Sequence, residues 1–62
     1  MTVKSVCYEA MEKLCKSQDF GAAAAVRDVQ RLVDPKGTKE LKPNQVKAVK
    51  GFLKLVAATA YS

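Results

Sequence analysis

The sequence contains no histidine and no tryptophan, and it has only three glycines and two cysteines among 62 residues. Without histidine, the chain lacks the side chain most often used in acid–base catalysis. It also has no glycine-rich phosphate loop and no paired carboxylates in a recognisable motif. A chain this short leaves little volume for a substrate pocket of the usual ~300 Å³ or more. The sequence therefore argues against an enzyme, and it predicts no cofactor, no metal and no small-molecule substrate.

The two cysteines, Cys7 and Cys15, limit the function further. Eight positions apart on one helix, they would be separated by a rise of ~12 Å, which is too far for a disulfide bond. Two isolated thiols also make no plausible zinc site. We therefore expect both cysteines to be small buried hydrophobic residues rather than redox or metal groups.

Long apolar runs are missing as well. No stretch approaches the ~18 apolar residues of a membrane span, and the N-terminal MTVKSVCYEAMEKLCK has charges spaced through it, unlike a signal peptide. The hydrophobic fraction of 48% is nevertheless too high for a disordered chain. We expect a complete, single-domain cytoplasmic protein spanning residues 1–62, with no membrane association. For a domain of this size, the free energy of unfolding is roughly 3–9 kcal/mol.

Apolar residues recur with helical spacing over about 3–18 and again over about 20–33. The predicted inner faces consist of Val3, Cys7, Ala10, Met11 and Leu14 in the first helix, and of Ala22, Ala25, Val26, Val29, Leu32 and Val33 in the second. Asp19 is placed to cap the second helix. The four alanines at 22–25 favour helix formation and let the first helix approach closely. This pattern is typical of an αα-hairpin with a tight connection.

A third helix is expected at about 43–60, after a loop that starts with Asp34-Pro35-Lys36-Gly37. Proline ends the second helix, Gly37 permits a left-handed turn, and Pro43 suits the first position of a new helix. Residues 38–41 are compatible with a single helical turn. The predicted inner face of the third helix consists of Val46, Val49, Leu53, Val56 and Ala60, with Phe52 beside them. The predicted fold class is all-α, a small three-helix bundle.

The net charge of +5 is concentrated in residues 35–62, where six lysines face a single glutamate, Glu40. Three of these lysines share one stripe of the third helix: Lys47, Lys50 and Lys54. The other three precede the helix: Lys36, Lys39 and Lys42. Lysines at helical spacing neutralise phosphates, which indicates a basic nucleic-acid-binding protein as one interpretation. The helix body has no arginine, asparagine or glutamine to read a base edge, and aromatic stacking platforms are few. The other interpretation is a solvated face that keeps an apolar helix soluble.

The end of the third helix, FLKLVAATAY at 52–61, is more apolar than a bundle helix requires. Besides the inner face, Leu55 lies with Ala48, Gly51 and Ala58 on a second side. A bundle helix normally buries one stripe, and Gly51 costs about 1 kcal/mol in mid-helix unless something packs closely against it. A surplus apolar face on a small protein usually marks an interface. We therefore predict a homodimer contact or a docking face for another protein, made of Gly51, Phe52, Leu55 and Ala58.

Residues 11–33 follow the pattern acidic-Phe-Glu-x-Ala-Ala-x-Leu-Arg-Asp-x-Ile-x-x-Leu. The identical matches are Asp19-Phe20, Ala23-Ala24 and Arg27-Asp28, while Val26 and Val33 stand in place of the two leucines. Upstream, Met11 and Cys15 occupy positions where apolar or small residues are usual. This stretch resembles the UVR motif, a helical hairpin found in excision-repair helicase and nuclease subunits and in chaperone adaptors. Gly21, Gln30 and Gln18 depart from it, replacing a glutamate, an isoleucine and an apolar residue. The resemblance implies a hairpin used for protein–protein contact, in which Arg27 and Asp28 contact the partner or stabilise the hairpin.

The residues taken alone give Arg27 and Asp28 a simpler role, as an exposed ion pair worth well under ~1 kcal/mol. As a whole, the sequence favours a small non-enzymatic protein-interaction module, a regulator, adaptor or inhibitor that docks on a larger protein through its C-terminal helix. The expected partner is another protein or a second copy of this chain. The alternative is a basic nucleic-acid-binding protein that uses the lysines of residues 36–54.

Overall fold

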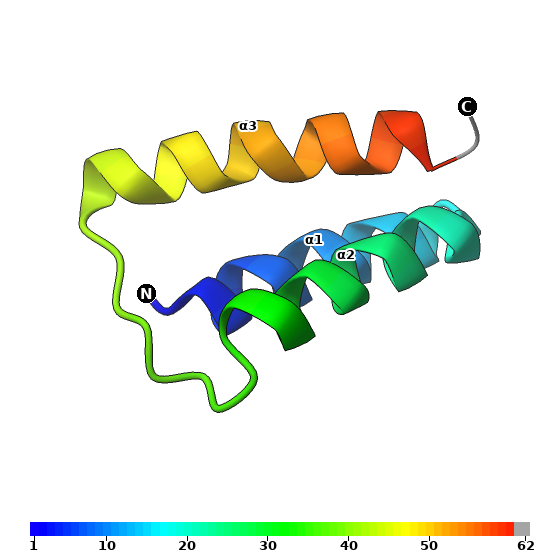
Figure 1. The fold of residues 1–62 in the computed structure, drawn as a ribbon. Helices are drawn as coiled ribbons and strands as arrows, with labels where there is room; N and C mark the ends of the chain where they lie inside the picture. The colour runs from blue at the N-terminus through cyan, green and yellow to red at the C-terminus, as the bar shows by residue number, and fades with distance from the viewer. Residues whose placement is uncertain (61–62) are drawn as a thin grey trace.

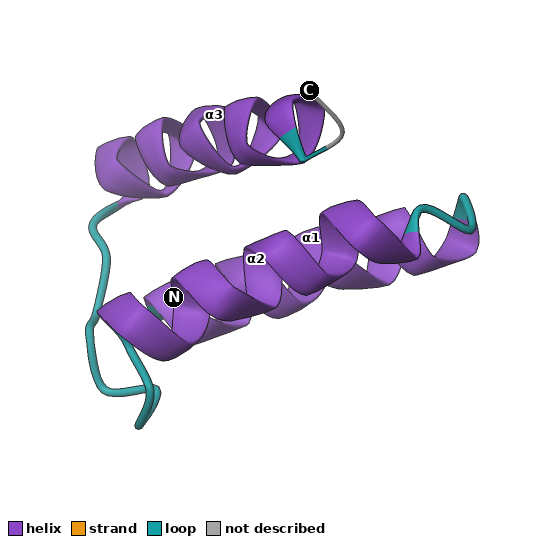
Figure 2. Ribbon diagram, turned by 45° about the vertical axis from the view of Figure 1, so that its right-hand side comes forward, coloured by secondary structure: helices purple, strands orange, loops and turns teal. Residues whose placement is uncertain are grey.

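A computed structural model describes residues 1–60 and contains three helices: α1 (Val3–Lys16), α2 (Phe20–Val33) and α3 (Pro43–Thr59). α1 and α2 lie side by side in opposite directions, and α3 runs along one side of this pair (Figures 1 and 2). The predicted all-α three-helix bundle is therefore confirmed. The end of the predicted apolar stretch, Tyr61, lies outside the described residues. None of the described helices is long and apolar enough to cross a membrane.

The connection between α1 and α2 is a tight turn closed by backbone hydrogen bonds. Gln18 adopts a left-handed conformation with a φ of 59°. Its N–H donates to the carbonyl of Cys15 at 2.9 Å, and the N–H of Asp19 donates to that of Leu14 at 2.8 Å. These two bonds satisfy carbonyls that the end of α1 would otherwise leave unpaired. The Asp19 carboxylate then accepts from the N–H of Ala22, so the predicted helix cap is confirmed.

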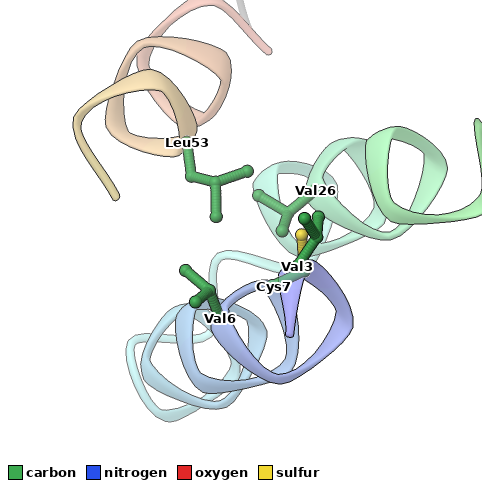
Figure 3. Packing of buried hydrophobic residues seen from close by; sticks show 5 residues of the cluster. All are labelled: Val3, Val6, Cys7, Val26 and Leu53. Carbon is green, nitrogen blue, oxygen red and sulfur yellow. The ribbon is translucent and has the colours of Figure 1, made fainter. Parts of the chain in front are cut away.

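The core is small and is shared unequally among the helices. The buried hydrophobic cluster consists of Val3, Val6 and Cys7 from α1, Val26 from α2 and Leu53 from α3. Leu53 points from α3 toward Val26 and Val6 (Figure 3). It is the one fully buried residue of α3, whose apolar neighbours Val46, Val49 and Val56 are only half-buried. The attachment of α3 to the hairpin therefore depends heavily on a single leucine.

The inner face of α2 differs from the predicted one. Its buried residues are Ala22, Ala23, Val26 and Gln30, whereas Leu32 is 84% exposed and Val33 is 42% exposed. The prediction assigned α2 the stripe with the most apolar residues. The observed stripe is rotated toward Gln30, and a hydrogen bond at the end of α2 offsets the cost of burying this amide. The Gln30 side chain donates to the backbone carbonyl of Asp34 at 2.7 Å.

Ala60, predicted for the inner face of α3, is also exposed, and so is Phe52, which was predicted both beside that face and as an interface residue. Phe52 is 53% exposed, and Ala60 lies past the last residue of the helix on the surface. α3 is covered on one side only, by the hairpin, so a narrow stripe around Leu53 is buried and residues at its margin stay in solvent. The predictions for Leu53, Val46, Val49 and Val56 are consistent with the structure.

Asp34 organises the chain between α2 and α3. Although it is a charged residue, it is only 2% exposed. One carboxylate oxygen, Oδ1, accepts from the N–H groups of Thr38 and Lys39 at 2.9 and 3.2 Å, and the other, Oδ2, accepts from the N–H of Lys4 at 3.2 Å. Burial acts to raise the pKa of Asp34, but the backbone N–H donors of Lys4 and residues 37–39 outweigh it and hold the pKa below its ordinary value.

The same connection completes the N-terminus of α1. The N–H of Val3 donates to the carbonyl of Lys39 at 3.0 Å, that of Lys4 donates to Asp34, and that of Ser5 donates to the Thr2 hydroxyl at 3.1 Å. The first three N–H groups of α1, which no helical carbonyl can satisfy, therefore all have acceptors. An isolated antiparallel bridge pairs Thr2 with Glu40. Residues 38–41 thus pass beside the start of α1, and they do not form the single helical turn with which their sequence is compatible.

Gly37 confirms the predicted left-handed turn, with a φ of 72°. A Cβ at this position would lie 2.9 Å from the Cδ of Lys4, a flexible side chain that can move aside, so the left-handed backbone is what favours glycine here. The turn brings residues 38–41 back to α1 and closes the bundle.

Candidate functional site

The predicted interface residues of α3 share an exposed face, which we call the outer face: Gly51, Phe52, Leu55 and Ala58. Leu55 is 66% exposed, and Phe52 lies beside it at the edge nearer the core. A Cβ placed on Gly51 would meet no atom within 4 Å among the described residues. The helix thus accepts the ~1 kcal/mol penalty of a mid-helix glycine without gaining a close intramolecular contact. Close packing within the described chain therefore does not account for Gly51.

The lysines of α3 occupy a different side of the helix from Phe52. All six predicted nucleic-acid contacts are exposed: Lys36, Lys39, Lys42, Lys47, Lys50 and Lys54. The Nζ of Lys50 lies 3.7 Å from an Oε1 oxygen of Glu9 on α1, so part of this charge is neutralised within the bundle. Lys42 precedes α3, and Lys54 lies about 18 Å farther along the helix axis. The structure therefore places the lysines in a long row rather than in one compact cluster.

Between α1 and α3 lies a groove that the sequence did not indicate. It has a volume of about 180 Å³. The apolar residues that line it come from both helices: Val6, Ala10, Leu14, Leu53 and Ala57. Four charged residues lie beside them: Glu9, Lys13, Lys50 and Lys54. The small side chains of Ala10 and Ala57 leave the space open. In the sequence, the only sign of this groove was the small size of Ala10 and Ala57. That sign could be interpreted only once the structure had shown that α1 and α3 pack against each other.

A second hollow of about 240 Å³ lies on the hairpin itself. It is lined by Met11, Cys15, Phe20, Ala23, Ala24 and Arg27. The Nε of Arg27 lies 3.8 Å from an oxygen of Asp28, and both side chains are largely exposed. They therefore form the outward-facing polar pair expected from the sequence, with a contribution to stability below ~1 kcal/mol. The alanine run provides close packing, since Ala22 and Ala23 are buried.

The cysteines have opposite environments. Cys7 is fully buried in the core, and its burial raises the pKa of its thiol, an effect that the negative charge of Asp34 reinforces. Cys15 is exposed, so its predicted burial is wrong. Position 15 lies near the end of α1 at the edge of the hairpin hollow, where the small side chains opposite it leave it uncovered. Within residues 1–60, no group of three or more histidine, cysteine or acidic residues is placed to hold a metal ion.

Because only the thiolate reacts, this difference predicts selective alkylation. N-ethylmaleimide at neutral pH is expected to modify Cys15 of the folded protein at least ~100-fold faster than Cys7, which reacts only when the core opens. Mass spectrometry of the intact protein and of its peptides measures both rates. In a Cys15→Ser variant, labelling should require urea; rapid labelling of that variant in native buffer would contradict the burial of Cys7.

Comparisons with protein-family models, with curated proteins and with solved structures found no match to this chain. The UVR resemblance remains a prediction for residues 11–33.

Proposed function

We propose that the protein is a small non-enzymatic interaction module, a regulator, adaptor or inhibitor that docks on a larger protein through α3. The observation that carries this proposal is the outer face, where Leu55 is 66% exposed beside a glycine with open space around it. A partner helix or loop could approach the α3 backbone closely at Gly51 and cover Leu55, Phe52 and Ala58. Burying an exposed leucine is worth ~1.5–3 kcal/mol, which a lone bundle of this size leaves unused.

The outer face is preferred over the other exposed apolar residues because its members are continuous. Phe20 and Leu32 are also exposed, but they lie near opposite ends of α2. On α3 the apolar residues follow one another along a single helical face, which is the arrangement recognised when helices bind in grooves or pair with each other. On the basis of the UVR resemblance, we propose Arg27 and Asp28 on the hairpin as a further partner contact. We propose that the module works in the cytoplasm.

Nucleic-acid binding through the lysine row is the second candidate, because those lysines are exposed and carry most of the net charge of +5. It is less favoured because the row is long and because Lys50 already lies near Glu9. Binding of nucleic acid through these lysines would also leave the apolar outer face of α3 without a role.

A matched pair of leucine variants tests the proposal. Leu55→Lys is expected to weaken capture of a native partner by at least ~10-fold while leaving the fold intact, whereas Leu32→Lys makes the same change on α2 and should capture normally. Tagged wild-type and variant proteins would be compared by quantitative mass spectrometry of captured proteins, with and without nuclease treatment.

Sedimentation of the purified proteins distinguishes a larger partner from a second copy. Concentration-dependent dimerisation that disappears in Leu55→Lys would place a second copy on the outer face. A strict monomer whose partner capture is the same in both leucine variants would remove the proposal. Capture that is lost on nuclease treatment would support the nucleic-acid candidate instead.

A further inference from the structure

The groove between α1 and α3 has a combination of shape and charge that the outer face lacks. Its walls are apolar side chains from two helices, while Lys13, Lys50 and Lys54 lie around it with Glu9 as the only acid among the described lining residues. We propose that this groove receives one large apolar side chain from an acidic segment of the partner protein, with carboxylates of that segment on the lysines. This inference rests on the proposed protein-interaction function, and it specifies the chemistry of the partner.

The size of the groove selects a side chain rather than a free ligand. Its volume of about 180 Å³ lies below the ~300 Å³ at which small-molecule pockets usually begin. A single phenylalanine, leucine or isoleucine suits such a space, and its burial against Leu14, Leu53 and Ala57 would remove apolar surface from water on both sides. An anchor of this kind, inserted into a well-defined hollow, is the usual centre of a protein interface.

The charges indicate which residues flank that anchor. α1 and α3 run in the same direction from the end of the bundle at which α3 begins (Figure 1). At one position along the groove, Lys50 lies 3.7 Å from Glu9, forming an ion pair across it. One helical turn farther on, Lys13 of α1 and Lys54 of α3 line the same groove. Within residues 1–60, neither of these two lysines has a carboxylate within 4 Å.

Among residues 1–60, Lys13 and Lys54 border the apolar hollow without an ion-pair partner, and this favours an occupant that brings its own carboxylates. Glutamate or aspartate one turn away from the apolar anchor on a partner helix would meet this requirement. Nucleic acid fits less well, because phosphates make no favourable contact with apolar walls and none of the described lining residues is an aromatic side chain on which bases could stack. An acidic amphipathic segment uses both the walls and the lysines.

A fluorescein-labelled synthetic helix tests the groove directly. The probe is a 15-residue peptide of glutamate and alanine with one central phenylalanine; the comparison peptides replace that phenylalanine by alanine, or the glutamates by lysines. Fluorescence anisotropy at low salt should show binding of the probe that weakens roughly 10-fold with central alanine and is absent for the lysine peptide. Equal binding of the phenylalanine and alanine peptides would overturn the insertion of an anchor.

Protein variants then locate the binding. Ala57→Phe fills the groove from α3 and should weaken probe binding at least ~10-fold, whereas Asn44→Phe adds the same side chain in the first turn of α3 and should have no effect. Lys54→Glu is expected to weaken binding ~10-fold, and Lys36→Glu, with the same change in net charge, less than ~3-fold. Circular dichroism confirms that each variant is folded; if Ala57→Phe is not, Ala10→Leu blocks the opposite wall.

The outcomes separate this inference from the proposed function. Probe binding that is unchanged in Ala57→Phe and Ala10→Leu but lost in Leu55→Lys would overturn the groove and leave the outer face as the docking site. Displacement of the probe by an equimolar random DNA duplex, with a steep dependence on salt, would overturn the acidic-protein assignment and support phosphate binding. Normal partner capture by Ala57→Phe, alongside its loss in Leu55→Lys, would also count against the groove.

Discussion

Replacing Leu53 by alanine is expected to lower the melting temperature by at least ~10 °C, and to leave much of the protein unfolded at 37 °C. Leu53 is 3% exposed and is the only fully buried residue of α3 among those described. Loss of a buried leucine side chain costs ~2–5 kcal/mol. That cost is comparable with the whole free energy of unfolding expected for a chain of this length, roughly 3–9 kcal/mol. Thermal and urea unfolding followed by circular dichroism measure the effect.

Leu55→Ala is the matched control, because it removes the same atoms from the opposite side of the same helix. Leu55 is largely exposed, so this change should alter the free energy of unfolding by less than ~0.5 kcal/mol. If both variants melt within a few degrees of the wild type, α3 is not held to the hairpin by Leu53 and the core described above is incorrect. If both are strongly destabilised, the outer face is packed against something in the free protein.

Replacement of Asp34 by alanine is expected to be the second most damaging change, lowering the melting temperature by roughly 10 °C or more. The alanine variant leaves the N–H groups of Lys4, Thr38 and Lys39 without their acceptor. These donors lie at the start of α1 and in the connection to α3, so two parts of the bundle loosen together. Asp34→Asn keeps the shape and one acceptor oxygen and should lie between the alanine variant and the wild type.

The contribution of Asp34 should also depend on pH in a predictable direction. Its pKa in the folded protein is below the ordinary value of ~3.9, so the folded state favours the ionised carboxylate. The associated stability is complete at neutral pH, begins to be lost as the pH falls below ~4, and is gone below the folded-state pKa. The difference in stability between the wild type and Asp34→Asn should therefore shrink between neutral pH and pH ~2.

Asp28→Asn provides the control for both Asp34 experiments. Asp28 is an exposed carboxylate of α2 whose ion-pair partner is Arg27, so its replacement should change the melting temperature by no more than ~4 °C. A loss of stability as large as that of Asp34→Asn would show that removal of a negative charge, rather than loss of the buried hydrogen bonds, destabilises the protein. If the difference in stability between the wild type and Asp34→Asn stays constant from pH 7 to pH 2, the pKa of Asp34 is not lowered in the folded protein.

The sequence by itself determined where the helices lie. Asp19 and Pro43 mark two helix starts, Gly37 marks a left-handed turn, and the helical spacing of apolar residues places all three segments within two residues of their observed ends. These features are local, because each depends on the conformation of a few neighbouring residues. The exposure of Leu55 was also foreseen, since it lies opposite a clear apolar stripe.

Only the tertiary structure decided which side of each helix is buried and what the connecting segment does. The most apolar stripe of α2 includes Leu32, yet the helix buries Gln30 instead, and the buried amide donates to the backbone carbonyl of Asp34. Asp34 appeared in the sequence as the end of a helix, but its carboxylate accepts from the N–H of Lys4, 30 positions away, as well as from those of Thr38 and Lys39 in the connection that follows. Hydrogen bonds between distant segments leave no periodic trace in the sequence.

The groove between α1 and α3 was likewise decided by the tertiary structure. Lys13 and Lys54 are 41 positions apart, and although Lys54 belongs to the predicted lysine stripe, no sequence pattern pairs it with Lys13. They border one apolar hollow because Leu53 holds α3 against α1 and because Ala10 and Ala57 are too small to fill the space between the helices. Periodicity predicts that a helix has an inner face, but the rotation and position of one helix against another are set by packing, which the local pattern does not encode.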